Sequence, residues 1–191
     1  MRKYIYCMQN DQVGLAMIEE GDIYFLRGLI CNSETTQFLL RAFPINEADE
    51  RSWVQSLYKG NPPTNLTYLI VYKSPNNGRA AVGTMGLHHI DYLNGTATTG
   101  TVLAPKFRNL GLGTSAKMLL LEYAFNRLNL RVVQSKIMSF NARSIRVQEK
   151  CGYREVARIP NWFNRAGDLH DEVILHCTRQ SFEEAKVTRA K

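Results

Sequence analysis

Apolar and β-branched residues gather in three consecutive runs in the middle of the chain, with Asn-Gly pairs between them. The runs cover residues 66–73, 80–90 and 96–104, and the pairs lie in Asn76-Asn77-Gly78 and Asn94-Gly95. Asn-Gly between strand-like segments is a strong hairpin signal, because both residues tolerate a positive φ. We therefore expect an antiparallel meander of three strands here.

After the meander the pattern changes to alternating helices and strands. The sequence predicts a helix over residues 112–127, a strand over 131–139 and a helix over 142–151 that Gly152 ends. Two further strands, at about 153–159 and 170–178, are expected to flank a turn at 164–168. This second half is typical of an α/β protein.

The N-terminal third adds three elements. We expect a strand over residues 12–19, a helix over 22–31 that begins at Asp22, and a helix that Asn46 caps and that runs to about Lys59. The predicted fold class is α/β with a mixed sheet, an antiparallel meander followed by β-α-β-α-β-β. A single domain is expected over residues 1–191, with a core from about 14 to 180 and a short basic C-terminal tail.

Composition narrows the class of protein. The chain has 191 residues, of which 45% are hydrophobic and 21% charged, as in one ordinary globular domain. It has neither an apolar run of the ~20 residues that a bilayer crossing needs nor a signal peptide. The four cysteines are scattered and lack metal-ligand spacing. We therefore expect a cytoplasmic protein with reduced thiols, no bound metal and no membrane partner.

The positive charge is concentrated in the second half of the chain. Residues 1–95 carry 8 Lys/Arg and 9 Asp/Glu, whereas residues 96–191 carry 16 and 8, so the net charge of +7 comes from the second half. An anionic ligand there is one explanation. A nucleic-acid surface and a solvated basic face are the alternatives.

The segment from Val102 to Thr114 joins a predicted strand to a predicted helix through a loop with two glycines. Its sequence is VLAPKFRNLGLGT. Glycines let consecutive backbone N–H groups turn toward one point at the positive end of the helix, and such an arrangement binds phosphate. Arg108 and Lys117 are expected to add positive charge beside it.

Three phosphate-binding motifs compete for this loop. A P-loop needs a lysine between Gly113 and Thr114, and none is present. The dinucleotide motif G-x-G-x-x-A is matched, but it requires an acidic residue at the end of the next strand, and residues 131–139 hold no acid. The third motif, R/Q-x-x-G-x-G/A, is matched by Arg108, Gly111 and Gly113.

That third motif resembles the pyrophosphate loop of the GNAT acetyltransferase superfamily. The run from Asn141 to Tyr153, NARSIRVQEKCGY, is similar to the second family signature, N-x-x-(A/S)-I-x-L-Y-E-K-x-G-F. The run from Gly86 to Asp91, GLHHID, resembles the G-L-H-x-I-D hairpin of the branch that holds ribosomal-protein N-terminal acetyltransferases and spermidine acetyltransferases. The resemblance covers residues 14–180 approximately.

The resemblance implies acetyl-CoA as co-substrate and a set of residues that bind it. The pyrophosphate would lie on Arg108, Asn109, Leu110, Gly111, Leu112, Gly113 and Thr114. The backbone of Val102 and Leu103 would pair with the pantetheine amides, and Asn141 would bind the pantetheine arm, with Ser144 and Gln148 on the same helical face. Arg146 belongs to a basic stripe, with Arg143 and Lys150, that would reach the 3′-phosphate. Helix capping by Asn141 and a solvated stripe are the structural alternatives.

The expected acid and base of the family are both substituted. Gln148 stands where many relatives have a proton-donating tyrosine, so Ser144 or a water would have to serve. Thr98 stands where many have a glutamate base. A two-residue or a four-residue hairpin loop would place His89 and Asp91 on the face of Thr98, with His88 opposite. We expect His89 as the base and Asp91 as the second candidate.

These features predict an N-acetyltransferase that moves an acetyl group from acetyl-CoA to a primary amine by direct attack. The amine would belong to a peptide N-terminus, a polyamine or another small molecule. Two alternatives stay open: an acyl-CoA-binding protein with little catalysis, and an acylase acting on a nucleic-acid-associated amine such as charged tRNA. A nucleic-acid partner is not favoured, and a homodimer stays open. Acids at Glu34, Glu47, Asp49 and Glu50 would suit a basic acceptor, although such acids also complement helix dipoles.

Overall fold

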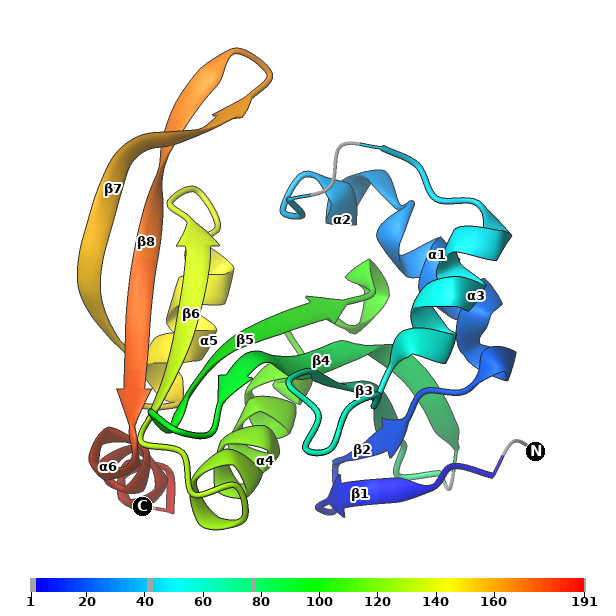
Figure 1. The fold of residues 1–191 in the computed structure, drawn as a ribbon, viewed down its shortest axis with the longest axis horizontal. Coiled ribbons are helices and arrows are strands. Elements are labelled where there is room, and N and C mark those ends of the chain that lie inside the picture. Colours follow the sequence, from blue (N-terminus) through cyan, green and yellow to red (C-terminus); the bar gives the residue numbers. More distant parts are fainter. Residues whose placement is uncertain (1–2, 41–42, 77, 191) are drawn as a thin grey trace. The chain divides into compact units, whose positions relative to one another are not determined.

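The computed structural model describes residues 3–40, 43–76 and 78–190. Within them, eight strands form one sheet in the order β1-β2-β3-β4-β5-β6-β8-β7 (Figure 1). The strands are β1 (Tyr6–Gln9), β2 (Val13–Met17), β3 (Leu66–Lys73), β4 (Arg79–Asp91), β5 (Thr96–Leu103), β6 (Val132–Met138), β7 (Arg154–Arg165) and β8 (Asp168–Thr178). The sheet is mixed, because β5 and β6 pair in parallel while β6 and β8 pair antiparallel. The expected α/β fold class is confirmed.

The helices lie where periodicity predicts most of them. They are α1 (Ile23–Ile30), α2 (Ser33–Thr36), α3 (Glu47–Ser56), α4 (Leu112–Asn126), α5 (Ala142–Lys150) and α6 (Arg179–Ala190), with 3-10 turns η1 (Glu20–Asp22) and η2 (Pro105–Phe107). The described chain divides into two compact units, one of residues 1–88 and 100–120 and the other of residues 89–99 and 121–191. The chain passes between the units within β4, β5 and α4. No helix of the described chain is long and apolar enough to span a bilayer.

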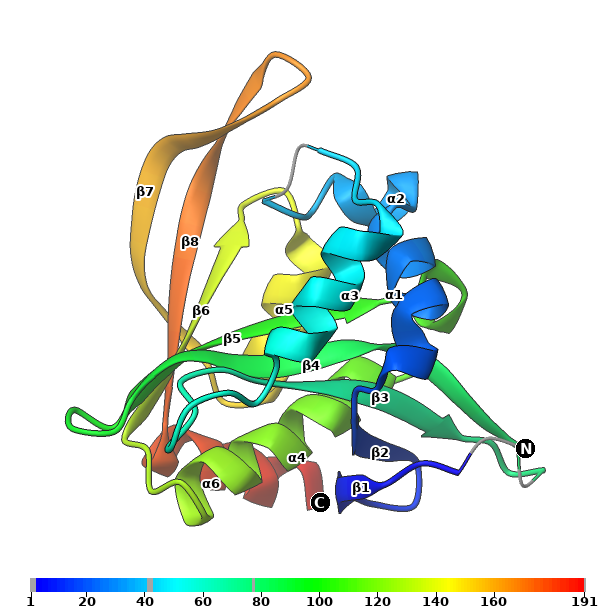
Figure 2. The ribbon, with the colours of Figure 1, turned by 45° about the vertical axis from the view of Figure 1, so that its right-hand side comes forward.

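In the first unit, α1 and α3 lie side by side over β2 and β3 (Figure 2). Ile23 and Leu26 of α1 and Val54 of α3 pack on Leu69 and Val71 of β3. The predicted cap is present, because Oδ1 of Asn46 accepts the N–H of Asp49 at 2.9 Å. A cap of this kind stabilises a helix by about 1 kcal/mol. The helix ends at Ser56, slightly before the predicted end.

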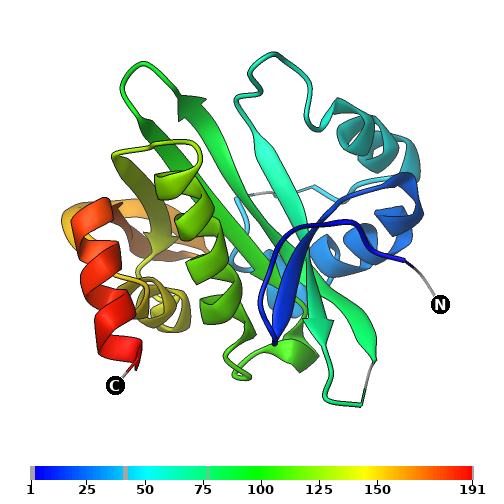
Figure 3. The ribbon, with the colours of Figure 1, turned by 90° about the horizontal axis from the view of Figure 1, so that it is seen from below.

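In the second unit, β7 and β8 form a long hairpin beside β6 (Figure 1). Helix α5 packs on β6 and helix α6 on β8. Helix α6 also lies beside the C-terminal end of α4 (Figure 3), where the rings of Phe125 and Phe182 are 5.5 Å apart. Nη1 of Arg179 donates to Oδ1 of Asn126 at 2.7 Å. The expected basic tail is thus largely a packed helix.

Candidate functional site

The loop from Arg108 to Thr114, which the family resemblance predicts to bind pyrophosphate, has two residues with a left-handed backbone. Asn109 has φ 63° and Gly111 has φ 75°, and Leu110 between them does not share this left-handed conformation. Alternation of left- and right-handed residues turns successive N–H groups into one concavity. Within the described chain, the N–H groups of residues 109–113 have no hydrogen-bond partner. The loop leads into the 15-residue helix α4, whose N-terminal dipole adds to the attraction for an anion.

Small residues let the end of β5 approach both this loop and β4. A Cβ on Gly113 would lie 3.1 Å from Cδ1 of Leu103, and a Cβ on Gly83 of β4 would lie 2.1 Å from the carbonyl oxygen of Val102. The parallel pairing of β5 with β6 runs through Thr96, Ala97 and Thr98. Beyond these residues, the backbone of Val102 and Leu103 lies outside that ladder. That this backbone binds the pantetheine amides, as the family resemblance implies, stays a prediction.

Side chains of the turn between β1 and β2 form hydrogen bonds to the loop and to the first turn of α4. Nε2 of Gln12 donates to the carbonyl oxygen of Leu110 at 3.2 Å, and Nδ2 of Asn10 donates to Oγ of Ser115 at 3.0 Å. Oδ1 of Asn10 also accepts the N–H groups of Gln12 and Val13. Sequence reasoning missed both supporting residues. The Asn-Asp turn at residues 10–11 was the only local signal, and it does not show what the turn contacts.

The two cations expected beside the loop have other positions. Arg108 bonds to protein atoms: its Nε donates to the carbonyl oxygen of Leu103 at 3.1 Å and its Nη2 to Oγ1 of Thr35 at 3.0 Å. Lys117 is fully buried. Lys117 thus lies on the side of α4 that faces the core, and the charge expected from it beside the loop stays a prediction. The donors that the loop itself offers are its backbone N–H groups.

Helix α5 carries the predicted polar face in the second unit. Oδ1 of Asn141 accepts the N–H of Ser144 at 3.2 Å, so Asn141 caps the helix. Ser144 is half-buried and Arg146 is exposed. Gln148 is only 4% exposed, and its Oε1 has no hydrogen-bond partner in the described structure. A buried amide oxygen without a donor is uncommon and marks a position where a ligand N–H would be favourable.

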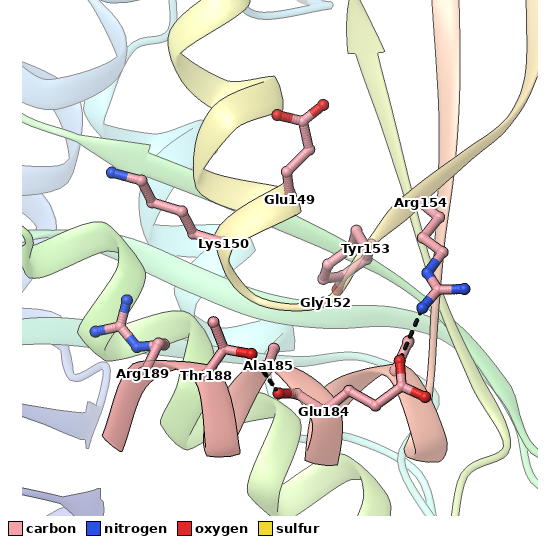
Figure 4. A pocket seen from close by; sticks show the side chains of 10 residues that line it. Glu149, Lys150, Gly152, Tyr153, Arg154, Glu184, Ala185, Thr188 and Arg189 are labelled. Carbon is pink, nitrogen blue, oxygen red and sulfur yellow. Dashed lines mark hydrogen bonds and ion pairs between the residues drawn. The ribbon is translucent and has the colours of Figure 1, made fainter. Parts of the chain in front are cut away.

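The end of α5 also borders a solvent-open groove of about 510 Å³ (Figure 4). Lys150 and Arg189 lie on one side of it, and Arg154 pairs with Glu184 at 2.7 Å on the other. Tyr153 lies beneath, and burial raises the pKa of its hydroxyl well above the usual value. Lys150, which the sequence placed in a phosphate-reaching stripe, thus lines a groove against α6.

The hairpin between β4 and β5 has a four-residue loop, residues 92–95, as in the second of the two predicted registers. Oδ1 of Asp91 accepts the N–H of Asn94 at 2.9 Å and its Oδ2 accepts the side-chain amide at 2.7 Å. These bonds, first from the side chain of Asn94 and then from its backbone, hold the pKa of Asp91 below its usual range. A carboxylate held in this way is a weak base.

Strand β4 is irregular at its two histidines. His89 is exposed and has φ 50°. The imidazole of His88 lies over two glycines, because a Cβ on Gly86 or on Gly100 would lie 3.1 or 3.5 Å from its ring atoms. His88 thus lies beside Gly100 of β5, and the expected placement of the two histidines relative to Thr98 stays a prediction.

Sequence comparison relates the chain to a known family. The model of the acetyltransferase (GNAT) domain matches residues 13–154. A spermidine N(1)-acetyltransferase of Vibrio cholerae serotype O1 is 24% identical over 173 residues, which are 91% of this chain and 96% of that protein. A prophage-derived N-acetyltransferase of Bacillus subtilis strain 168 is 26% identical over 141 residues, 74% of this chain and 76% of that protein.

Solved structures share the fold. The crystal structure of the Vibrio cholerae spermidine N-acetyltransferase in complex with CoA and spermine has a TM-score of 0.80 at 18% identity, covering 91% of this chain and 99% of that one. A GNAT-family acetyltransferase of Bacillus anthracis has a TM-score of 0.75 at 20% identity, covering 92% and 99%. Because the family model spans well over half of the sequence, the chain belongs to the GNAT acetyltransferases, which use acetyl-CoA as co-substrate.

Proposed function

We propose that this protein transfers the acetyl group of acetyl-CoA to a primary amine by direct attack. The observation that carries the proposal is the row of N–H groups at residues 109–113, which have no partner in the described chain and lead into the start of α4, with a left-handed backbone at Asn109 and Gly111. A pyrophosphate is the ligand of the family that this cradle fits. Bound acetyl-CoA supplies a thioester that is activated toward amines.

We propose the remaining cofactor contacts for each unit separately. In the first unit, the backbone of Val102 and Leu103 is offered to the pantetheine amides, with the carbonyl oxygen of Leu103 already accepting from Nε of Arg108. In the second, Ser144 and the unpartnered Oε1 of Gln148 are offered to the pantetheine arm, and Arg146 to the 3′-phosphate. The N–H of Ala104, the next residue, is not offered to the cofactor, because it donates to the carbonyl oxygen of Val82 at 2.9 Å.

A base has to remove a proton from the acceptor, because a free alkylammonium group has a pKa near 10. His89, the base expected from the sequence, stays a candidate. We favour His88, because its ring lies beside Gly100, two residues before Val102 on β5. Asp91 is disfavoured by its bonds to Asn94 and the lowered pKa that they cause.

The leaving thiolate lacks the usual proton donor. The carboxamide of Gln148 donates a hydrogen bond but does not release a proton at neutral pH. We therefore assign the proton to Ser144 or to a water that it holds. A thiolate leaving group of modest basicity makes this step less demanding than deprotonation of the amine.

Two of the acids near α1 and α3 pair with arginines. Glu47 pairs with Arg51 at 3.0 Å and with Arg27 at 3.7 Å, and Glu20 pairs with Arg51 at 2.9 Å. A polyamine carries several positive charges and requires several uncompensated acids. This pairing favours an acceptor with a single amino group, such as a monoamine or a peptide N-terminus, over spermidine.

The nucleic-acid alternative rests on Trp162, which is 60% exposed on β7. Its basic neighbours are engaged within the protein. Arg158 pairs with Glu155 at 3.0 Å and with Asp171 at 3.4 Å, and the guanidinium of Arg165 lies over the ring of Phe163. Non-specific nucleic-acid binding needs a groove with uncompensated cations beside its aromatic residues. This hairpin does not favour it.

A panel of amines tests the proposal. The wild-type protein is incubated with acetyl-CoA and a monoalkylamine, spermidine or a short peptide with a free N-terminus, and the release of free thiol is measured. We expect release with at least one amine, faster with the single-amine acceptors. If CoA binds but no amine releases thiol, the acyl-CoA-binding alternative is correct. If only an aminoacyl-tRNA is acylated, the nucleic-acid alternative is correct.

A further inference from the structure

The guanidinium of Arg108 joins two segments of the first unit that are far apart in the sequence. Besides Leu103 and Thr35, it contacts Glu34: both Nη atoms reach the carbonyl oxygen of Glu34 at 3.4 Å, and the Glu34 carboxylate lies 3.8 Å from Nη1. The Arg108 side chain is only 12% exposed. Its donors are thus directed mainly at protein acceptors on α2 and at the last residue of β5.

Helix α2 needs such contacts to keep its place. It is a single turn, Ser33–Thr36, and helices of this length are unstable in isolation. Asn32, at its N-cap, makes no capping bond, and the buried Oδ1 of Asn32 has no partner in the described chain. Thr35 is buried and its hydroxyl accepts from Arg108. The arginine therefore replaces the missing cap as the anchor of the helix.

The anchor places α2 next to the reacting end of the proposed cofactor site. Leu103 ends β5, and its carbonyl oxygen and the hydroxyl of Thr35 both lie within 3.1 Å of the same guanidinium. In the proposed site, an amine that attacks a thioester beside Val102 and Leu103 would come close to α2, which Arg108 joins to Leu103. A displaced α2 would leave the cradle at residues 109–113 intact but would change the space that receives the amine.

We propose that Arg108 is a positioning residue that fixes α2 against the end of β5 and so shapes the acceptor site, while backbone N–H groups hold the pyrophosphate. The proposal rests on the proposed acetyl transfer. It differs from the role that the motif implies, in which the guanidinium itself binds phosphate. The two roles predict different losses when the planar, forked side chain is replaced by lysine, which keeps the charge.

Amide hydrogen exchange tests the anchor without reference to activity. In the wild type, the amides of Thr35, Thr36, Phe38 and Leu39 are bonded within the α2 turn. We expect Arg108→Lys and Thr35→Val each to speed their exchange about five- to tenfold, and the double variant to add little, because both remove the same contact. Arg79→Lys, an exposed arginine in the same unit, is the matched control and should leave exchange unchanged.

CoA binding and acceptor kinetics complete the test. Arg108→Lys should change the Kd of CoA less than about threefold while raising the KM of the amine about five- to tenfold. A phosphate-binding role would instead weaken CoA more than about tenfold and leave the α2 amides protected. That result would overturn the proposal. Exchange and CoA binding can be read even if no amine is acetylated, so failure of the proposed function is seen separately.

Discussion

At the scale of single residues, Tyr58 shows a contact that no local pattern announces. Its hydroxyl accepts the N–H of Ile18 at 3.1 Å and donates to the carbonyl oxygen of Thr67, which joins the end of β2 to the start of β3. The backbone of Tyr58 has φ 61°, a conformation that tyrosine rarely adopts. Burial raises the pKa of this hydroxyl to about 12. Because the sequence pattern places Tyr58 within a helix that runs to Lys59, it does not predict that this hydroxyl joins two strands.

Replacing Tyr58 by Phe should lower stability and change its pH dependence. The loss of two bonds to buried backbone groups should cost about 1–3 kcal/mol of unfolding free energy at pH 7. In the wild type, tyrosine ionises near pH 10 in the unfolded chain and near 12 in the folded one, so its contribution is complete below pH 10 and decreases as pH rises from 10 to 12.

Urea unfolding at pH 8, 10 and 11 measures both effects. The unfolding free energy of Tyr58→Phe should be lower than that of the wild type at pH 8, and it should decrease less between pH 10 and 11. Tyr24→Phe is the control, because Tyr24 is 90% exposed, and it should follow the wild type. Parallel curves for wild type and Tyr58→Phe would show that the pKa of Tyr58 is not raised.

At the scale of elements, periodicity predicts the long segments and misses the short or irregular ones. Strand β3 and helices α1, α4 and α5 lie within about one residue of their predicted bounds. Strand β1 has four residues and too few alternations to be recognised. The β7–β8 hairpin is longer than predicted. Pro160 interrupts the strand pattern on which the prediction rests, and the pairing shifts there, between Ile159 and Phe163, and then continues.

The same distinction holds for the candidate site. The cradle at residues 109–113 is a local backbone feature, so its glycine spacing could be read from the sequence. The partners of Arg108 on α2 and the support of Leu110 by Gln12 join segments about 70 and 100 residues apart. Only the tertiary fold determines them. The turn at Asn77 lies outside the described residues.

The irregularity in β4 gives the prediction that belongs to this scale. If His88 is the base, His88→Ala should lower kcat/KM about 10²–10⁴-fold. His89→Ala, one residue further along, is the matched comparison and should change the rate far less.

The kcat/KM of each variant with an accepted amine, compared with that of the wild type, provides the measurement. If only His89→Ala lowers kcat/KM, His89 is the base, as expected from the sequence. Near-normal rates in both variants would assign the proton to water.

At the scale of the whole molecule, the excess of positive charge lies in the second half of the chain, and it remains after ion pairing. Arg154 pairs with Glu184, Arg158 with Glu155, and Lys186 with Glu122 at 2.9 Å. The carboxylates of these pairs are already counted in the net charge, so the remaining excess attracts an anionic ligand.

The central claim is that the loop at residues 108–114 binds acetyl-CoA through its backbone, and isothermal titration of CoA into wild type and Gly113→Val tests it most directly. A Cβ at residue 113 meets only the end of the Leu103 side chain, so the variant should fold, but its branched side chain should cover the N–H groups that face the pyrophosphate. Gly28→Val, which has open space around its Cβ in α1, is the matched control. We predict that CoA binds the wild type and Gly28→Val alike, and that no binding is detected for folded Gly113→Val. An unchanged Kd in that variant would contradict the account.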